Sequence, residues 1–329
     1  PDGQKTNIAL TQFTRTITKD EARQLLQQTY QQYEGPANEL VMPYSNERVA
    51  LVSLCYNRGV NNPRLAPVLD AIREGNRAEA WYQIRYNSQT TNPLYVNGIA
   101  NRRYEEADLF GLSNAGTLTQ DQEVAQAKEQ VRMWIRHGNA ITTYETTYSL
   151  APSGSLSAES YIGTAVSRLA AIFASGTTID YAIVGAGLES YAYLEQAPSE
   201  TLYGTDKNDL IFGEGGNDTI NGMEGNDVIY GGNGSDHIYG GSGAGDDVLI
   251  GGAEHDFYYY KAGDGNDKII DSSVGNTIVL TDANGDTEFF TTLFGTGSNI
   301  WTTADGSIAL THNSPWKITL EDGGTIELG

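Results

Sequence analysis

The sequence is poor in residues that cross-link or anchor a protein. Cys55 is the single cysteine among 329 residues, so no internal disulfide can form. No run of about eighteen apolar residues occurs, so we expect no transmembrane segment. No basic and then apolar leader opens the chain, so we expect no Sec-type signal peptide, and Pro1 in place of Met indicates a processed start.

Positive charge is also scarce. The chain has 20 Lys and Arg against 42 Asp and Glu, a formal net charge of −22. Without a basic cluster to neutralise phosphates, we expect no nucleic-acid partner. The four histidines lack metal-site spacing, and no G-x-S-x-G nucleophile motif occurs. Hydrophobic residues, at 39%, are enough for real cores, and the length predicts two or three domains.

The acidic residues instead recur in a nonapeptide repeat that occupies residues 204–259. Its blocks read GTDKNDLIF, GEGGNDTIN, GMEGNDVIY, GGNGSDHIY, an eleven-residue GGSGAGDDVLI, and GGAEHDFYY. Each block carries one recurrent aspartate, followed two residues later by an aliphatic side chain or, in the last block, by Tyr258. The recurrent aspartates are Asp209, Asp218, Asp227, Asp236, Asp247 and Asp256.

Each block predicts a glycine-rich turn followed by a very short strand. One inward apolar side chain per nine residues cannot bury a core alone, so the strands must stack as an array. Glycine allows turn conformations that a β-carbon forbids, and such turns expose backbone carbonyls. Carboxylates and carbonyls are hard oxygen ligands that suit Ca²⁺. The repeat therefore predicts a parallel β-roll that binds several calcium ions.

Charge repulsion supports a role for calcium in folding. Residues 204–271 contain 11 Asp and 3 Glu against 3 Lys, a net of −11, which is half of the whole chain's charge. Stacked carboxylates repel one another, so we expect the metal-free roll to be unfolded and calcium to fold it. An acidic, glycine-rich disordered linker is the alternative, and the strict positions of the aspartates and aliphatic residues argue against it.

These blocks resemble the RTX (repeats-in-toxin) family over about six repeats. The resemblance implies type I secretion from a Gram-negative bacterium without a signal peptide, and folding in extracellular calcium; it also implies a toxin-like context. The tail YKAGDGNDKIID is similar to the element that closes such arrays, where Asp264, Asp267 and Asp271 are candidate ligands.

Two blocks depart from the family pattern. The eleven-residue block places Asp246 beside Asp247, so we expect its loop to bulge and its site to be altered. The first block has Thr205 and Asp206 where glycine and a small residue are usual. The predicted metal ligands are the six recurrent aspartates together with Asp206, Asp246 and Asp267.

Residues 1–112 have a different, helical pattern. Thr18 and Glu21 form a capping box for a first helix. Ser45 is expected to cap a second, largely apolar core helix that ends at Gly59. Further helices are predicted at residues 65–74, 77–85 and 97–110. The segment is therefore predicted to be a small all-α bundle.

Four blocks in this bundle resemble phage-type lysozymes in order and spacing. They read ITKDEARQLL, ALVSLCYNRG, AIREGNRAEAWYQI and NGIANRRYEEADLF. The resemblance implies binding of bacterial peptidoglycan and hydrolysis of its β-1,4 glycosidic bond. It also implies that Tyr56, Asn57 and Asn87 line the substrate cleft, although a core position is favoured for Tyr56. Arg102 and Arg103 are expected on a solvated helix face.

The catalytic motif of that family is not found here. Glycoside hydrolysis needs a general acid and usually a second carboxylate. The first sixteen residues contain Asp2, Thr6 and Thr11 but no Glu, so the catalytic residues stay unknown. The chain is similar to the larger helical lobe without the acid-bearing helix. A fragment of a longer enzyme, a degenerate wall-binding lysozyme and a chance similarity all remain open.

The remaining segments complete a multidomain α+β organisation. Residues 113–202 predict a connector with helices at 119–136 and 157–173, packing onto the first coil of the roll. Residues 203–271 form the roll. Residues 272–329 alternate as six short strands and predict an antiparallel cap carrying the secretion region. Two functions compete: a secreted muramidase-type enzyme, and a catalytically silent wall-binding or structural module of a larger RTX toxin or adhesin.

Overall fold

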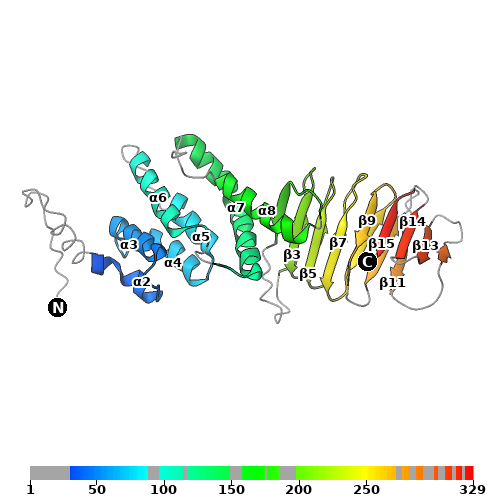
Figure 1. Cartoon of the computed structure of the whole chain (residues 1–329), viewed down its shortest axis with the longest axis horizontal. Coiled ribbons are helices and arrows are strands. Elements are labelled where there is room, and N and C mark those ends of the chain that lie inside the picture. Colours follow the sequence, from blue (N-terminus) through cyan, green and yellow to red (C-terminus); the bar gives the residue numbers. More distant parts are fainter. Residues whose placement is uncertain are drawn as a thin grey trace, which may run out of the picture. The chain divides into compact units, whose positions relative to one another are not determined.

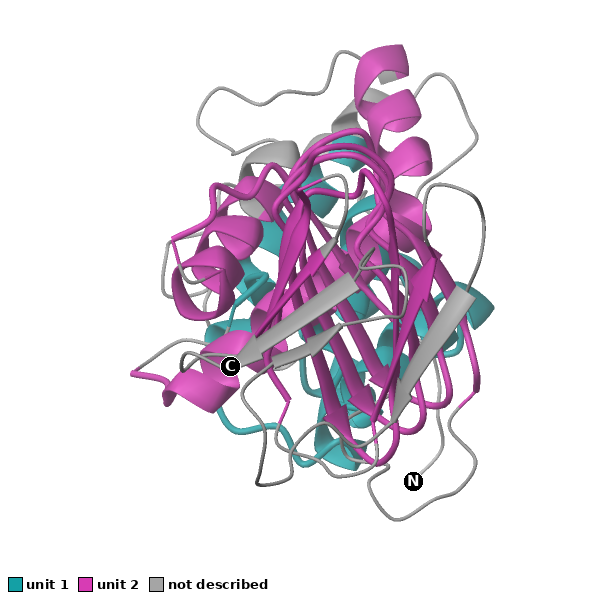
Figure 2. Cartoon of the chain, turned by 90° about the vertical axis from the view of Figure 1, so that its right-hand side faces the viewer, with its two compact units in different colours: residues 1–115 teal, residues 116–329 magenta. Residues whose placement is uncertain are grey.

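The computed structural model describes residues 30–87, 96–113, 117–148, 158–174, 176–185, 198–271, 276–281, 287–291, 300–302, 308–312, 316–320 and 323–328. The chain divides into two compact units, residues 1–115 and 116–329 (Figure 2). The capping-box helix predicted from Thr18 and Glu21 lies outside the described residues.

The described part of the first unit is helical, as predicted. Ser45 Oγ accepts a hydrogen bond from the Arg48 amide at 3.3 Å, and Gly59 ends the same helix at φ +86°. The elements are η2 (Gln31–Tyr33), α2 (Gly35–Glu39), α3 (Asn46–Arg58), η3 (Pro63–Leu65), α4 (Ala66–Arg73), α5 (Arg77–Tyr82), the π-helical turn η4 (Gln83–Asn87) and α6 (Val96–Phe110).

The core of this unit forms where α3 packs against α6 and where α4, α5 and η4 close around it. Leu51 and Leu54 of α3 are buried, and so is Trp81 of α5. Tyr86 lies edge to face with Tyr104, with ring centroids 5.8 Å apart. The apolar spacing in the sequence is therefore that of helices that share a core.

The second unit begins with two helices, α7 (Gln120–Tyr148) and α8 (Ala158–Phe173). The sequence predicts the first of them over residues 119–136, and the structure extends it to Tyr148. The helix continues through Gly138, where an added Cβ would lie 3.0 Å from the Trp134 ring, so glycine makes room for that ring. Buried Ile141 extends the apolar stripe into the added turns.

The nonapeptide repeat forms a roll of two sheets, and the strands of the repeat run parallel within each sheet (Figure 1). Successive strands of one sheet are offset first by 18 residues, as in Leu210 opposite Val228, and then by 20, as in Val228 opposite Val248. The first sheet contains β1 (Tyr181–Val184), β3 (Asp209–Gly215), β5 (Val228–Asn233), β7 (Val248–Ala253) and β9 (Asn266–Ile269). The second contains β2 (Thr201–Tyr203), β4 (Thr219–Asn221), β6 (His237–Tyr239), β8 (Phe257–Lys261) and β10 (Thr277–Thr281).

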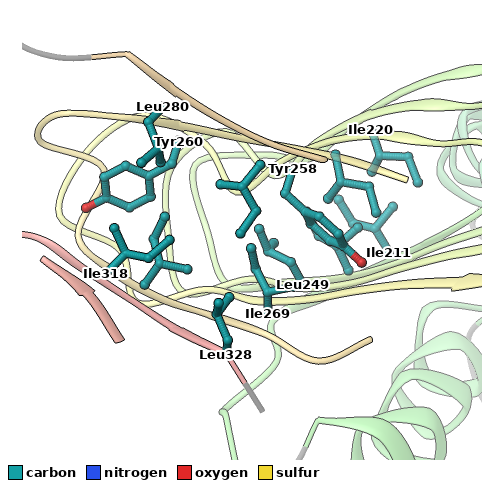
Figure 3. Close-up of a cluster of buried hydrophobic side chains, with 13 residues drawn as sticks. Ile211, Ile220, Leu249, Tyr258, Tyr260, Ile269, Leu280, Ile318 and Leu328 are labelled. Carbon is teal, nitrogen blue, oxygen red and sulfur yellow. The ribbon is translucent and has the colours of Figure 1, made fainter. Parts of the chain in front are cut away.

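The predicted aliphatic ladder fills the space between the two sheets (Figure 3). Tyr258 occupies the ladder position of the last block, as predicted, and is 1% exposed. Since every rung stacks on the next, no single coil has a core of its own. The ladder comprises Ile211, Ile220, Ile229, Ile238, Leu249, Tyr258 and Ile269.

The two outer faces of the roll differ. The first sheet turns Leu210, Phe212 and Val228 outward, and α7 and α8 cover them. The second sheet carries polar side chains such as Thr219 and Asn221 at the corresponding positions. The predicted connector therefore packs on the first coils of the roll through the apolar face of one sheet.

The C-terminal strands form the predicted cap and also lengthen the roll. Strands β10 and β15 run parallel to β8 and β9, while the other pairings are antiparallel. Alternation of apolar residues has the same period in both directions, so it does not reveal strand orientation. Ile318 and Ile326 join the core of the roll. The strands are β11 (Thr287–Thr291), β12 (Ile300–Thr302), β13 (Ile308–His312), β14 (Trp316–Leu320) and β15 (Thr325–Leu328).

Candidate metal centre

The recurrent aspartates lie in two rows, each at the turn that leads into one sheet. Each recurrent aspartate immediately precedes a strand, or begins one in the case of β3, because the turn ends there; Asp267, which continues the first row, is the second residue of β9. Blocks of nine residues alternate between the sheets, so every second aspartate falls in the same row. The first row is Asp209, Asp227, Asp247 and Asp267; the second row is Asp218, Asp236 and Asp256.

Within a row, every carboxylate except that of Asp209 accepts a hydrogen bond from the backbone of the preceding coil. The amide of Asp209 donates to Asp227 Oδ1 at 2.8 Å, and that of Asp227 donates to Asp247 Oδ1 at 2.8 Å. In the second row, the amide of Asp218 donates to Asp236 Oδ1 at 2.8 Å. One oxygen of each of these carboxylates therefore holds the coils in register.

The other oxygen of several of these carboxylates is left for a ligand. Among the described residues, the Oδ2 atoms of Asp218, Asp227, Asp236 and Asp256 are buried and have no hydrogen-bond partner. A buried anion without a partner is costly, because it loses its water without compensation. A bound cation would remove this cost.

The first glycine of a block has no Cβ, and this lets a backbone carbonyl of the next coil approach the same carboxylate oxygen. A Cβ added to Gly222 would overlap both Asp227 Oδ2 and the carbonyl oxygen of Gly240. A Cβ on Gly231 would likewise overlap Asp236 Oδ2 and a carbonyl of the next coil. A carboxylate oxygen and a carbonyl oxygen thus converge where only glycine fits. This donor set consists of hard oxygens, which fit Ca²⁺.

Burial dominates the electrostatics of both rows. Burial, with a further contribution from neighbouring aspartates, raises the pKa of Asp227, Asp236 and Asp267 to about 8. Burial also raises the pKa of Asp256 to about 7 and that of Asp218 to about 6. Without a metal, the roll therefore favours protonated carboxyl groups at neutral pH, and a cation would compete with those protons.

The rows do not form compact metal clusters. In the described ranges, no three His, Cys, Asp or Glu side chains converge on one metal position. The aspartates instead repeat once per coil along an edge. A calcium ion in a row would therefore take one or two carboxylates and complete its shell with carbonyls and water, which its flexible coordination permits.

The eleven-residue block keeps its place in the first row. Asp247 Oδ1 accepts from Asp227, and the Asp247 amide donates to Asp267 Oδ1 at 3.1 Å. The two extra residues therefore change the loop and not the row. At this loop a pocket opens that is lined by Glu224, Gly225 and residues 242–245. Asp246 lies outside the row and accepts from the Asn266 amide at 3.1 Å.

The first block differs in the way its sequence suggests. Asp206 is exposed and lies outside both rows. Thr205 donates to Asp209 Oδ2 through its amide at 2.5 Å and its hydroxyl at 2.9 Å. The oxygen that has no partner in other blocks, Oδ2, is therefore bound here, and Asp209 Oδ1 is instead the buried oxygen without a hydrogen-bond partner.

Sequence reasoning missed a second ladder beside the first row. The amide of Asn226 donates to Asn208 Oδ1 at 2.8 Å, and the amide of Asp246 donates to Asn226 Oδ1 at 3.1 Å. The signal was the asparagine that directly precedes the recurrent aspartate in each of the first three blocks. Its side chain ties successive turns together and so supports the carboxylate row.

The candidate substrate residues of the helical unit are only partly brought together. Tyr56 is 59% exposed and lies edge to face against Tyr33 at 5.1 Å, so the favoured core position for Tyr56 is wrong. It follows the buried stripe of α3 and faces outward. Asn57 Nδ2 donates to Glu106 Oε1 at 3.2 Å. Asn87 instead donates to Gln83 on η4.

The arginine pair expected on a solvated face divides. Arg102 is exposed and donates to Asn57. Arg103 is 2% exposed and forms an ion pair with Glu106, so its predicted solvation is wrong. Ser53 Oγ donates to the same carboxylate at 2.5 Å. Burial raises the pKa of Glu106, while Arg103 opposes that shift. The charged stretch of α6 therefore contains one buried ion pair beside an exposed arginine.

Comparison with protein families finds two matches. Phage lysozyme matches residues 3–106, and the RTX calcium-binding nonapeptide repeat (4 copies) matches residues 199–228, 214–244 and 242–269. The chain contains a lysozyme-like domain and RTX calcium-binding repeats. The comparisons with curated proteins and with solved structures found no match. The RTX matches coincide with the two aspartate rows, and the lysozyme match contains α3 and most of α6.

The lysozyme-like domain and the RTX roll contain no candidate membrane helix among their described residues: none is both long enough and apolar enough to span a bilayer.

Proposed function

We propose that this protein is a secreted bacterial RTX protein whose roll folds on binding several calcium ions outside the cell, and whose lysozyme-like domain acts on peptidoglycan. The observation that carries the first half is the pair of aspartate rows with buried, unpaired oxygens among the described residues. The match over residues 3–106 supports the second half.

Calcium would act as the folding trigger. Removing the ion leaves carboxylates stacked one coil apart, each raised in pKa by burial and by its neighbours. Folding then requires proton uptake, whereas calcium supplies the positive charge directly. A chain unfolded at low cytosolic calcium would suit the type I secretion machinery, and millimolar calcium outside would fold it.

Hydrolysis of the glycan is the favoured action of the lysozyme-like domain. Such hydrolysis needs a carboxylic acid that protonates the leaving oxygen. Glu106 is buried and bound by Arg103, Ser53 and Asn57, so its place is structural. We assign the general acid to no residue of the described part, and Tyr56 and Asn57 remain candidates for sugar contacts.

The second candidate is a catalytically silent wall-binding or structural module of a larger RTX toxin or adhesin. The hydrogen bonds of Glu106 favour this second function, because they tie the buried carboxylate to Ser53 and Asn57 of its own domain. The exposed Tyr56 beside Tyr33 could still stack on a sugar ring.

Two assays on purified cell walls separate these functions. Turbidity clearing is measured for this chain with calcium and with EDTA. Pull-down by insoluble peptidoglycan is measured in parallel. Clearing supports the enzyme. Pull-down without clearing supports the binding module, and absence of both discards a peptidoglycan role.

The calcium half has its own test. Circular dichroism with and without EDTA is expected to show loss of β-structure when calcium is removed. Unchanged spectra would reject calcium-induced folding whatever the wall assays show.

A further inference from the structure

The second aspartate row ends differently from the first. The Asp256 amide donates to Asn276 Oδ1 at 2.9 Å, the contact that an aspartate accepts in the earlier coils. Asn276 keeps the hydrogen bond but brings no charge. The last position of this row would therefore have one carboxylate where Asp218 and Asp236 each have a charged neighbour in the next coil.

A carboxylate from outside the repeat lies at this position. Tyr258 Oη donates to Asp271, and it accepts from the Gly251 amide at 2.7 Å. Tyr258 fills the core slot that isoleucine or leucine fills in other coils, and it is the ladder residue that carries an oxygen to this turn. Both hydrogen-bonding roles of its hydroxyl are used, so the orientation of Asp271 is set by the core.

Three groups converge beside Gly251. A Cβ on this glycine would overlap both Asp256 Oδ2 and Tyr258 Oη. Asp256 is 0% exposed, and its Oδ2 has no donor among the residues that the structure describes. After burial, the Asp271 carboxyl is the main group that raises the pKa of Asp256, so the two carboxyls are close.

We propose that Asp256 and Asp271 form a calcium site at the C-terminal end of the second row, with Tyr258 as the residue that positions Asp271. Asp271 takes over the charge that Asn276 does not supply. Two carboxylates match the charge of one divalent ion, and every group involved is a hard oxygen. The site rests on calcium binding by the roll and adds a non-repeat ligand that closes the array.

Calcium titration by calorimetry on the full chain tests the site, with calcium alone as the probe. Asp271→Asn is expected to bind one fewer calcium ion than wild type. The double variant Asp271→Asn with Asn276→Asp is expected to recover that ion, because it moves the charge to the ladder position. Asp70→Asn removes one charge from an exposed pair on α4 and serves as the control.

Tyr258→Phe separates the positioning role from the charge. The ring stays in the core while the oxygen is lost, so calcium affinity at one site is expected to fall about 10-fold or more, as for other residues that hydrogen-bond to a metal ligand. This variant also keeps the test valid if Asp271→Asn does not fold with calcium.

The outcomes are distinct. Equal calcium stoichiometry and affinities in Asp271→Asn and Asp70→Asn would overturn the site, and so would an unchanged isotherm for Tyr258→Phe. If wild type itself binds no calcium, the proposed function fails first, whatever the variants do.

Discussion

Lys128 Nζ lies 2.8 Å from Glu214 Oε1, and both side chains are almost fully removed from water. Arg132 Nη2 lies 3.3 Å from the other oxygen of the same carboxylate. Glu214 has φ +77°, and its neighbours in the next coils, Gly232 and Gly252, are glycines with positive φ. A residue in this region is strained and persists only when its surroundings hold it. Helix α7 provides that hold at the first turns of the roll.

Glu214→Gly is expected to destabilise the calcium-loaded second unit by about 1–4 kcal/mol. It relieves about 1–2 kcal/mol of backbone strain, but it breaks a buried ion pair, which costs about 3–5 kcal/mol. Denaturant unfolding followed by far-UV circular dichroism measures the change. Adding Lys128→Met is expected to restore part of the loss, and a single variant as stable as wild type would disprove the role of the ion pairs.

Gly222→Ala is expected to cost about 1–3 kcal/mol and to weaken calcium binding, because its Cβ would overlap Asp227 Oδ2 and the Gly240 carbonyl. Thermal unfolding with and without calcium measures both effects. Gly163→Ala is the matched control: the same change in α8 meets nothing within 4 Å and is expected to stabilise by about 0.5–1 kcal/mol. Equal behaviour of the two variants would refute the crowded oxygen site.

Acid is expected to stabilise the metal-free roll. Burial raises the pKa of Asp227 and Asp236 to about 8 from an unfolded value near 3.9. Folded carboxyls therefore hold protons more tightly, and this contribution is complete below about pH 4 and lost as the pH rises through about 8. In EDTA, β-structure measured by circular dichroism should increase from pH 8 to pH 5. Apparent calcium affinity should fall over the same interval, and an opposite trend in either quantity would contradict the buried rows.

Cys55 is expected to report on the lysozyme-like domain alone. It is fully buried in α3, and burial together with Glu106 raises the pKa of its thiol to about 11. A thiol reagent at pH 8 should therefore react slowly with the folded protein and rapidly in denaturant. Protection should persist in EDTA, where the roll unfolds. Rapid labelling on calcium removal would instead show that the two units unfold together.

Much of the metal centre was predictable because it is local in the sequence. The period of the repeat places Asp218 and Asp236 at equivalent turn positions, and it places Ile220 and Ile238 inward. The position of Asp247 was harder to predict, because two added residues obscure the period. The backbone resolves this by moving the insertion into the exposed loop and preserving the hydrogen bond at the strand.

The sequence by itself determined the roll, its rows of oxygen donors and the helical character of residues 30–87 and 96–110, since each depends on spacing along the chain. The tertiary structure alone decided which charges are buried. Glu214 meets Lys128 only after distant segments pack. Arg103 and Glu106 are neighbours on α6, and their ion pair is buried where α3 packs against that helix. The contact between Asp271 and Tyr258 likewise depends on the folded roll. The parallel docking of β15 on β9 was decided in the same way. The physical reason is that desolvation and strand direction are set by neighbours in space, which local periodicity does not encode.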